Sequence, residues 1–251
     1  MSVPAPSRPS RALRSLPLAL AGMTFLLFAA GRDPRAVGPT LVVAAVLLAP
    51  VVIGRWRMRR LLVSGDVERV IGTWEGSIAR IAHAETMAPL LRATAYAAYG
   101  WLEPARRAMD RAVKGAAWDA AVEQRLFVET LLDAFEGRRD DALRKARELE
   151  ALPNRGGGLM GRRRVASLRR GLSAFARAFT HESLDGDARV LSRAAGASPL
   201  VYWAMRYAEA IVAIDRGRAS EVAPLLAGAP QWPRESAFQE YHHELLAHAG
   251  G

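Results

Sequence analysis

The sequence contains no cysteine, and only five of its 251 residues are histidine. The absence of cysteine excludes disulfide bonds and thiolate metal centres, and it is compatible with a domain in the reducing cytoplasm. Three of the histidines cluster near the C-terminus, at His242, His243 and His248. Their spacings differ from the i, i+4 spacing with which two histidines on one helix bind a metal. We therefore expect no metal and no cofactor.

Motifs for catalysis are absent as well. The sequence has no nucleophile elbow and no phosphate-binding loop, because the glycines at 156–158 are not followed by the lysine and hydroxyl residue that such a loop needs. Asp140 and Asp141 lie at the start of a predicted helix, where the helix dipole stabilises negatively charged side chains. No segment shows the sustained apolar and polar alternation that predicts a strand. We therefore predict an all-α protein that is not an enzyme.

Two long apolar runs occupy the N-terminal region. One has 17 uncharged residues and the next has 19, and only a four-residue charged turn separates them. At about 1.5 Å rise per residue, each run makes a helix of roughly 26–28 Å, close to the ~30 Å hydrocarbon core of a bilayer. We predict a transmembrane hairpin over residues 15–54, with spans at about 15–31 and 36–54.

Two other interpretations of these runs stay open. A cleaved signal peptide would explain the basic tail and the first run, but cleavage after Ala30 would place the large Phe28 where a small residue is needed. A buried hairpin in a soluble core is the second alternative. It is disfavoured because two long runs whose only charges lie in one short turn are hard to bury in such a core.

The net charge of +10 is concentrated beside the apolar runs. Residues 1–64 carry +8 of it, and the rest of the chain has 26 basic and 24 acidic residues. This distribution removes the main argument for nucleic-acid binding, so we expect no nucleic-acid partner. By the positive-inside rule, the basic tail at 1–14 and the chain after residue 54 face the cytoplasm. We predict a multi-pass protein of the cell (inner) membrane, of bacterial type because the composition is rich in arginine and alanine.

An internal repeat follows the apolar runs. Glycines close successive helical runs at Gly65, Gly100, Gly137, Gly186 and Gly217. In the clearest unit, small and apolar residues flank the glycine at fixed offsets: Ala93, Tyr96, Gly100, Ala105, Met109 and Ala112. This unit resembles the tetratricopeptide repeat, in which a helical hairpin turns at a glycine and small residues let the second helix approach the first. The unit at Gly186 fits the pattern least well.

The resemblance implies a helical-repeat solenoid over residues 55–233, followed by a C-terminal capping helix at 234–251. A helical bundle whose turns happen to contain glycine is the alternative. The wide gap before Gly186 predicts a Gly/Arg-rich insertion at 154–170. Its arginines form either a solvated surface or a contact for anionic lipid or an acidic partner. They are Arg155, Arg162, Arg163, Arg164, Arg169 and Arg170.

Repeat proteins of this kind bind peptides on the face formed by the first helix of each pair. The resemblance places five residues on that face: Gln124, Phe127, Leu131, Tyr207 and Ile211. Their apolar character indicates either a hydrophobic peptide or a face buried by tight curvature, and we favour the second. We predict a membrane-anchored adaptor that holds a protein partner at the cytoplasmic face. A structural subunit of a larger membrane complex and a regulator of a membrane-associated enzyme are the alternatives.

Overall fold

The computed structural model describes residues 37–78, 80–153 and 158–250. Every regular element in these ranges is a helix, which confirms the predicted all-α class. The chain divides into two units, Met1–Met58 and Arg59–Gly251, and each is described by itself.

The described part of the first unit lies within helix α2, Val37–Val63, which continues into the second unit. Several large apolar side chains of α2 are exposed, among them Val46, Val52 and Trp56. No helix in the described part of the chain is both long enough and apolar enough to cross a membrane. The first predicted span lies outside the described residues and the second falls on α2, so the structure does not confirm the transmembrane hairpin.

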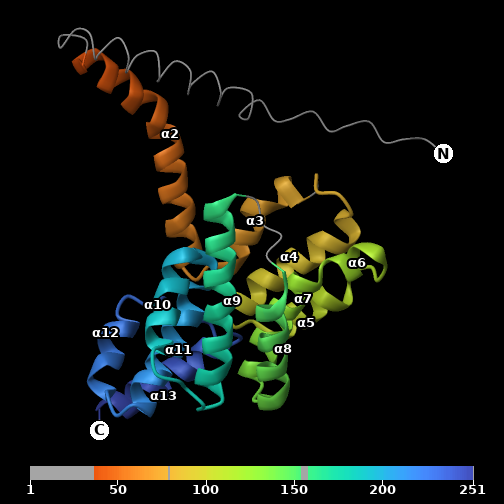
Figure 1. Cartoon of the computed structure of the whole chain (residues 1–251), viewed down its shortest axis with the longest axis vertical. Helices are drawn as coiled ribbons and strands as arrows, with labels where there is room; N and C mark the ends of the chain where they lie inside the picture. The colour runs from red at the N-terminus through yellow and green to blue at the C-terminus, as the bar shows by residue number, and fades with distance from the viewer. Residues whose placement is uncertain (1–36, 79, 154–157, 251) are drawn as a thin grey trace. The chain divides into compact units, whose positions relative to one another are not determined.

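The second unit is built from helix pairs in which the second helix folds back against the first (Figure 1). The four pairs are α4 (Ala84–Ala98) with α5 (Leu102–Asp110), α7 (Val122–Phe135) with α8 (Arg139–Ala151), α9 (Leu159–Phe179) with α10 (Asp187–Ala197), and α11 (Tyr202–Asp215) with α12 (Val222–Leu226). The first helices of successive pairs also pack on one another, α4 on α7, α7 on α9 and α9 on α11. This arrangement is compatible with the predicted helical repeat.

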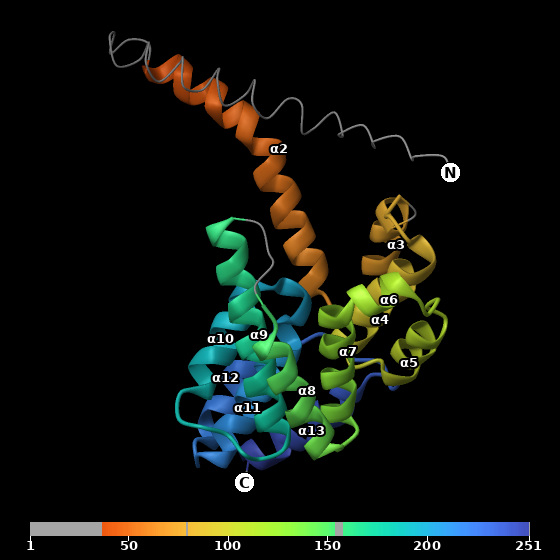
Figure 2. The same ribbon diagram turned by 45° about the vertical axis from the view of Figure 1, so that its right-hand side comes forward.

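The remaining helices flank these pairs (Figure 2). They are α3 (Val67–Ile78), α6 (Ala116–Ala120), α13 (Ala237–Gly250) and the short 3-10 helices η2 (Pro199–Val201) and η3 (Ala219–Glu221). Helix α3 packs on α4 at one end of the row of pairs, and α13 packs on α11 and α12.

The same turn ends the first helix of all four pairs. Its central residue is Gly100, Gly137, His181 or Gly217, with φ between 58° and 73°. In each turn the next N–H donates to the carbonyl five residues before it, at 2.8 or 2.9 Å, as in a Schellman motif. This motif fixes the point at which the chain reverses. The second helix of each pair therefore starts from the same kind of turn.

The third of these turns corrects the sequence analysis. Gly186 was expected to make that turn, but it precedes α10 with φ 94°, and His181 makes the turn instead. The position of glycine did not predict this turn, because a non-glycine residue can adopt the left-handed conformation at a cost of about 1–2 kcal/mol. The unit at Gly186 fits the repeat pattern poorly because the turn lies at His181 instead.

An aromatic cluster fills the centre of the second unit. The ring of Tyr207 stacks on Phe238, with centroids 4.6 Å apart and planes 12° apart. The Trp232 indole N–H donates to the Tyr207 hydroxyl at 2.7 Å, and the Tyr207 oxygen lies 2.9 Å from His242 Nδ1. Phe135 of α7 packs edge-on against Phe238 at 5.3 Å. Helix α13 and the segment before it therefore belong to the core rather than forming a detachable cap.

The C-terminal segment also reaches the first helix pair. The Ser236 hydroxyl donates to the Tyr99 carbonyl at 2.8 Å, across 137 residues of sequence. The next N–H, that of Ala237, donates to the Gly100 carbonyl at 2.9 Å. These two bonds hold the start of α13 against the turn between α4 and α5.

The last turn of α2 is held in the same core. Its terminal carbonyls have lost their helical partners and accept side-chain donors from two other helices. The Tyr99 hydroxyl donates to the Leu62 carbonyl at 2.6 Å, and the Trp203 indole N–H donates to the Val63 carbonyl at 2.8 Å. Burial raises the pKa of the Tyr99 hydroxyl far above its ordinary value, so it remains a donor across the physiological range.

Gly171 in α9 predicts a difference between two glycine substitutions. A Cβ at Gly171 would overlap the Ala194 side chain of α10, whereas a Cβ at Gly72 in α3 would meet nothing within 4 Å. We expect Gly171→Ala to lower the free energy of unfolding by about 1–3 kcal/mol, because α9 and α10 must separate. Gly72→Ala should raise it by about 0.5–1 kcal/mol through helix propensity. Urea unfolding followed by circular dichroism measures both, and equal effects would contradict this account of the packing.

The contact between Tyr207 and His242 predicts a dependence of stability on pH. Burial, with a smaller effect of His243, lowers the pKa of the His242 imidazole. The folded state therefore favours neutral His242, whose Nδ1 accepts from Tyr207, and this stabilisation is lost as pH falls below about 6.5.

We expect the melting temperature of His242→Asn, which retains an acceptor, to fall less between pH 7 and pH 5 than that of the wild-type protein. Loss of one such hydrogen bond is worth about 1 kcal/mol. His243→Asn is the matched control and should fall nearly as much as the wild type, because His243 is the smaller of the two causes that lower the His242 pKa. If both variants behave alike, His242 is not the titrating group.

Candidate functional site

The face that the repeat resemblance assigns to peptide binding is largely buried. Phe127, Leu131, Tyr207 and Ile211 all lie in the core, and only Gln124 is partly exposed. Tyr207 is covered by Trp232 and Phe238 of the chain's own C-terminal segment. The four buried residues therefore act as packing groups in this structure.

The arginines of the predicted insertion do not act as a group. Residues 159–170 form the first half of α9, and Arg155 lies outside the described residues. Arg169 is buried, where it donates to the carbonyls of Leu152 and Pro153 and pairs with Glu123 at 3.1 Å. The exposed members are Arg162, Arg163, Arg164 and Arg170. One arginine of the set thus has a structural role that its sequence context did not indicate.

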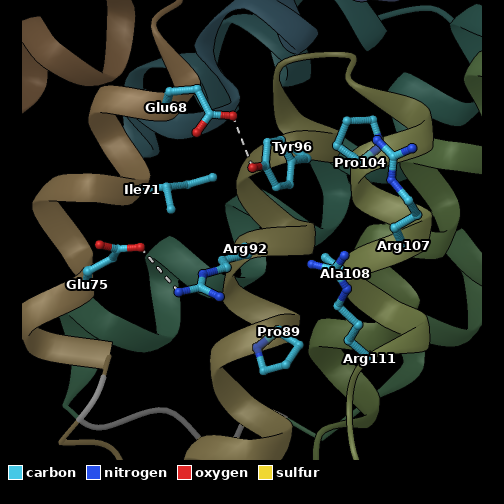
Figure 3. A pocket seen from close by; sticks show the side chains of 10 residues that line it. All are labelled: Glu68, Ile71, Glu75, Pro89, Arg92, Tyr96, Pro104, Arg107, Ala108 and Arg111. Atoms are coloured by element: carbon cyan, nitrogen blue, oxygen red, sulfur yellow. Dashed lines mark hydrogen bonds and ion pairs between the residues drawn. The ribbon is translucent and has the colours of Figure 1, made fainter.

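A groove between α3, α4 and α5 is the strongest candidate for a binding site (Figure 3). Its volume is about 550 Å³, within the range of ligand pockets. Ile71, Ala108, Pro89 and Pro104 supply its apolar surface. We call it the arginine groove, after the three arginines that border it: Arg92, Arg107 and Arg111.

Each carboxylate on the acidic side of the arginine groove has a local partner. Glu75 of α3 pairs with Arg92 of α4 at 3.3 Å, and Glu68 of α3 accepts from the Tyr96 hydroxyl at 3.1 Å. Burial, and then the bond to Glu68, raise the pKa of the Tyr96 hydroxyl, which therefore stays protonated. Helices α3 and α4 are joined by these two contacts.

The basic side of the arginine groove is not neutralised. Arg107 of α5 and Arg111, the C-cap residue directly after it, are both exposed, and their i, i+4 spacing places them on one face. Neither guanidinium has an ion-pair partner among the described residues. Figure 3 shows both on the α5 side of the groove, opposite Glu68 and Glu75, with the α4 residues between. Two adjacent guanidinium groups favour bidentate binding of a carboxylate or phosphate.

The arginine groove was not predicted from the sequence. The residues around Gly100 match a repeat pattern, and the only local signal of a basic face is the spacing of Arg107 and Arg111. The acidic wall comes from α3, whose glutamates face α4 only after the helices pack. The groove is therefore a product of tertiary structure.

No family model, curated protein sequence or solved structure matches this chain. Among the residues that the structure describes, no group of three or more potential ligands is placed to hold a metal ion.

Proposed function

We propose that this chain is a helical-repeat adaptor that binds an acidic segment of a partner protein in the arginine groove. The observation that carries the proposal is the pair of unneutralised guanidinium groups of Arg107 and Arg111 at the edge of a groove with an apolar floor. The groove is lined by three arginines and two glutamates, so its net charge is positive. An extended peptide with carboxylates beside apolar side chains complements both features.

The resemblance to tetratricopeptide repeats supports binding of a peptide rather than catalysis. The peptide would lie in the groove between α3, α4 and α5. The face formed by the first helices of the pairs is filled by the C-terminal segment. The partner's segment would place acidic side chains against α5 and apolar side chains against Ile71 and Ala108.

We expect the double variant Arg107→Glu/Arg111→Glu to bind a fluorescein-labelled Glu-Leu-Glu-Leu-Glu peptide at least about tenfold more weakly than the wild-type protein, because favourable charge pairs become repulsive. Fluorescence anisotropy with the purified full chain measures the affinity. The matched control is Arg189→Glu/Arg193→Glu, which reverses two exposed arginines with the same spacing on α10. Equal weakening by both double variants would contradict specific binding in the groove.

We also propose that the adaptor is attached to the cytoplasmic face of a membrane by its N-terminal region. This part rests on the sequence, namely the two charge-free runs and the arginines that flank them. The exposed apolar side chains of α2 add support, because Val51, Val52 and Ile53 would be stabilised by transfer from water to lipid.

A single introduced cysteine tests the orientation, since the sequence has none of its own. We expect Ser192→Cys, at an exposed position of α10, to react with a membrane-impermeant maleimide only after cells are permeabilised. The protein should also remain in the membrane pellet after alkaline extraction. Labelling in intact cells would place the helical unit outside, and release by alkaline extraction would rule out a spanning anchor.

A further inference from the structure

A second hollow lies where α7, α9 and α11 end and α13 passes beside them. Its volume is about 540 Å³, and we call it the α13 hollow. Its apolar lining consists of Phe135, Phe179, Ile211, Ile214 and Tyr241. None of these residues belongs to the arginine groove, so the two sites are separate.

Aromatic rings form much of this lining in fixed positions. Tyr241 packs edge-on against Phe179 at 5.1 Å and lies 6.0 Å from Phe135. Its hydroxyl donates to the Phe135 carbonyl at 3.3 Å, which holds the ring in place. Burial raises the pKa of Tyr241 to about 12, so the ring is neutral at physiological pH. Rings of this kind bind apolar bodies and attract cations to their faces.

The polar groups around the α13 hollow give it an electronegative character. Helices α7, α9 and α11 all end here, and a helix C-terminus carries partial negative charge. The Glu244 carboxylate lies on the rim and has no ion-pair partner among the described residues. The rim also holds Arg139, and Glu136, which is paired with Arg106 and Arg138. Glu244 is therefore the acidic group left open to a ligand.

His181 supplies an oriented acceptor at the same place. Its Nδ1 lies 2.8 Å from a carboxylate oxygen of Asp215, and a carboxylate can only accept, so Nδ1 carries the proton. The other ring nitrogen, Nε2, is then free to accept a proton donor. The three equivalent turns use glycine, whereas this one holds a histidine at φ 58°. Because the local conformation favours glycine, a histidine at this position indicates a role for its side chain in addition to the turn.

We infer that the α13 hollow binds an organic cation, a primary amine or guanidinium carried on an aromatic or aliphatic body. The cation donates to His181 Nε2 and is balanced by Glu244 and the helix ends. The body packs on Tyr241 and the neighbouring phenylalanines. This site is independent of the arginine groove, which takes ligands of the opposite charge.

Titration of the full chain with benzylamine, followed by the chemical shifts of the histidine rings, tests the inference. We expect binding that weakens about tenfold in His181→Gly, because one hydrogen bond to the cation is lost. That variant adopts the residue of the three equivalent turns and therefore keeps the fold. Glu244→Gln should weaken binding about threefold, as expected for an exposed charge. Glu240→Gln makes the same change one turn earlier on α13, away from the hollow, and should leave the affinity unchanged.

Two probes with the same benzyl group decide whether charge is recognised. Benzyl alcohol, which is neutral, and phenylacetate, which is anionic, should bind at least about tenfold more weakly than benzylamine. Equal binding of all three, or no binding of benzylamine, would overturn the inference. Acetyl-arginine amide carries the same chemistry on a peptide backbone. Tighter binding of that probe than of benzylamine would identify the basic side chain of a partner protein as the source of the cation.

Discussion

The hydroxyl of Tyr207 connects three parts of the chain through two hydrogen bonds. It accepts from Trp232 and faces His242, while its ring stacks on Phe238. These contacts bring the last segment of the chain onto the first helices of the pairs. Because two polar atoms and three rings are buried together, the segment cannot leave without exposing both unpaired hydrogen-bonding groups and apolar surface. The position of α13, and with it the hollow beside it, depends on this cluster.

The repeated turn is the second constraint on the structure. It ends α7, α9 and α11 in the same way, and the ends of these three helices line one hollow. This is the α13 hollow, which α13 also lines. The arginine groove has a different origin, since it depends on how α3 meets α4 and on which charges are left after Glu75 has paired with Arg92. The two proposed sites thus arise from separate features of the fold.

Several parts of the fold could be predicted from the sequence. The all-α class followed from apolar spacing, and three of the four turns followed from Gly100, Gly137 and Gly217. The fourth was missed because His181 takes a conformation that glycine usually supplies. The resemblance assigned Tyr207 and Leu131 to a peptide-binding face, whereas both are buried in the core. The residues of the arginine groove were not predicted, because its two walls come from helices that no local pattern brings together.

The sequence by itself determined the local features of the structure, namely which segments form helices and where most of the turns lie. Helix periodicity and turn chemistry act over about five residues, and the concentration of positive charge before residue 65 is a property of composition. Only the tertiary structure decided which faces are covered and which charges stay unpaired. Ser236 reaches Tyr99 across 137 residues, and His181 meets Asp215 across 34. Burial and ion pairing depend on such distant neighbours, so neither the filled inner face nor the two proposed sites could be derived before the helices were packed.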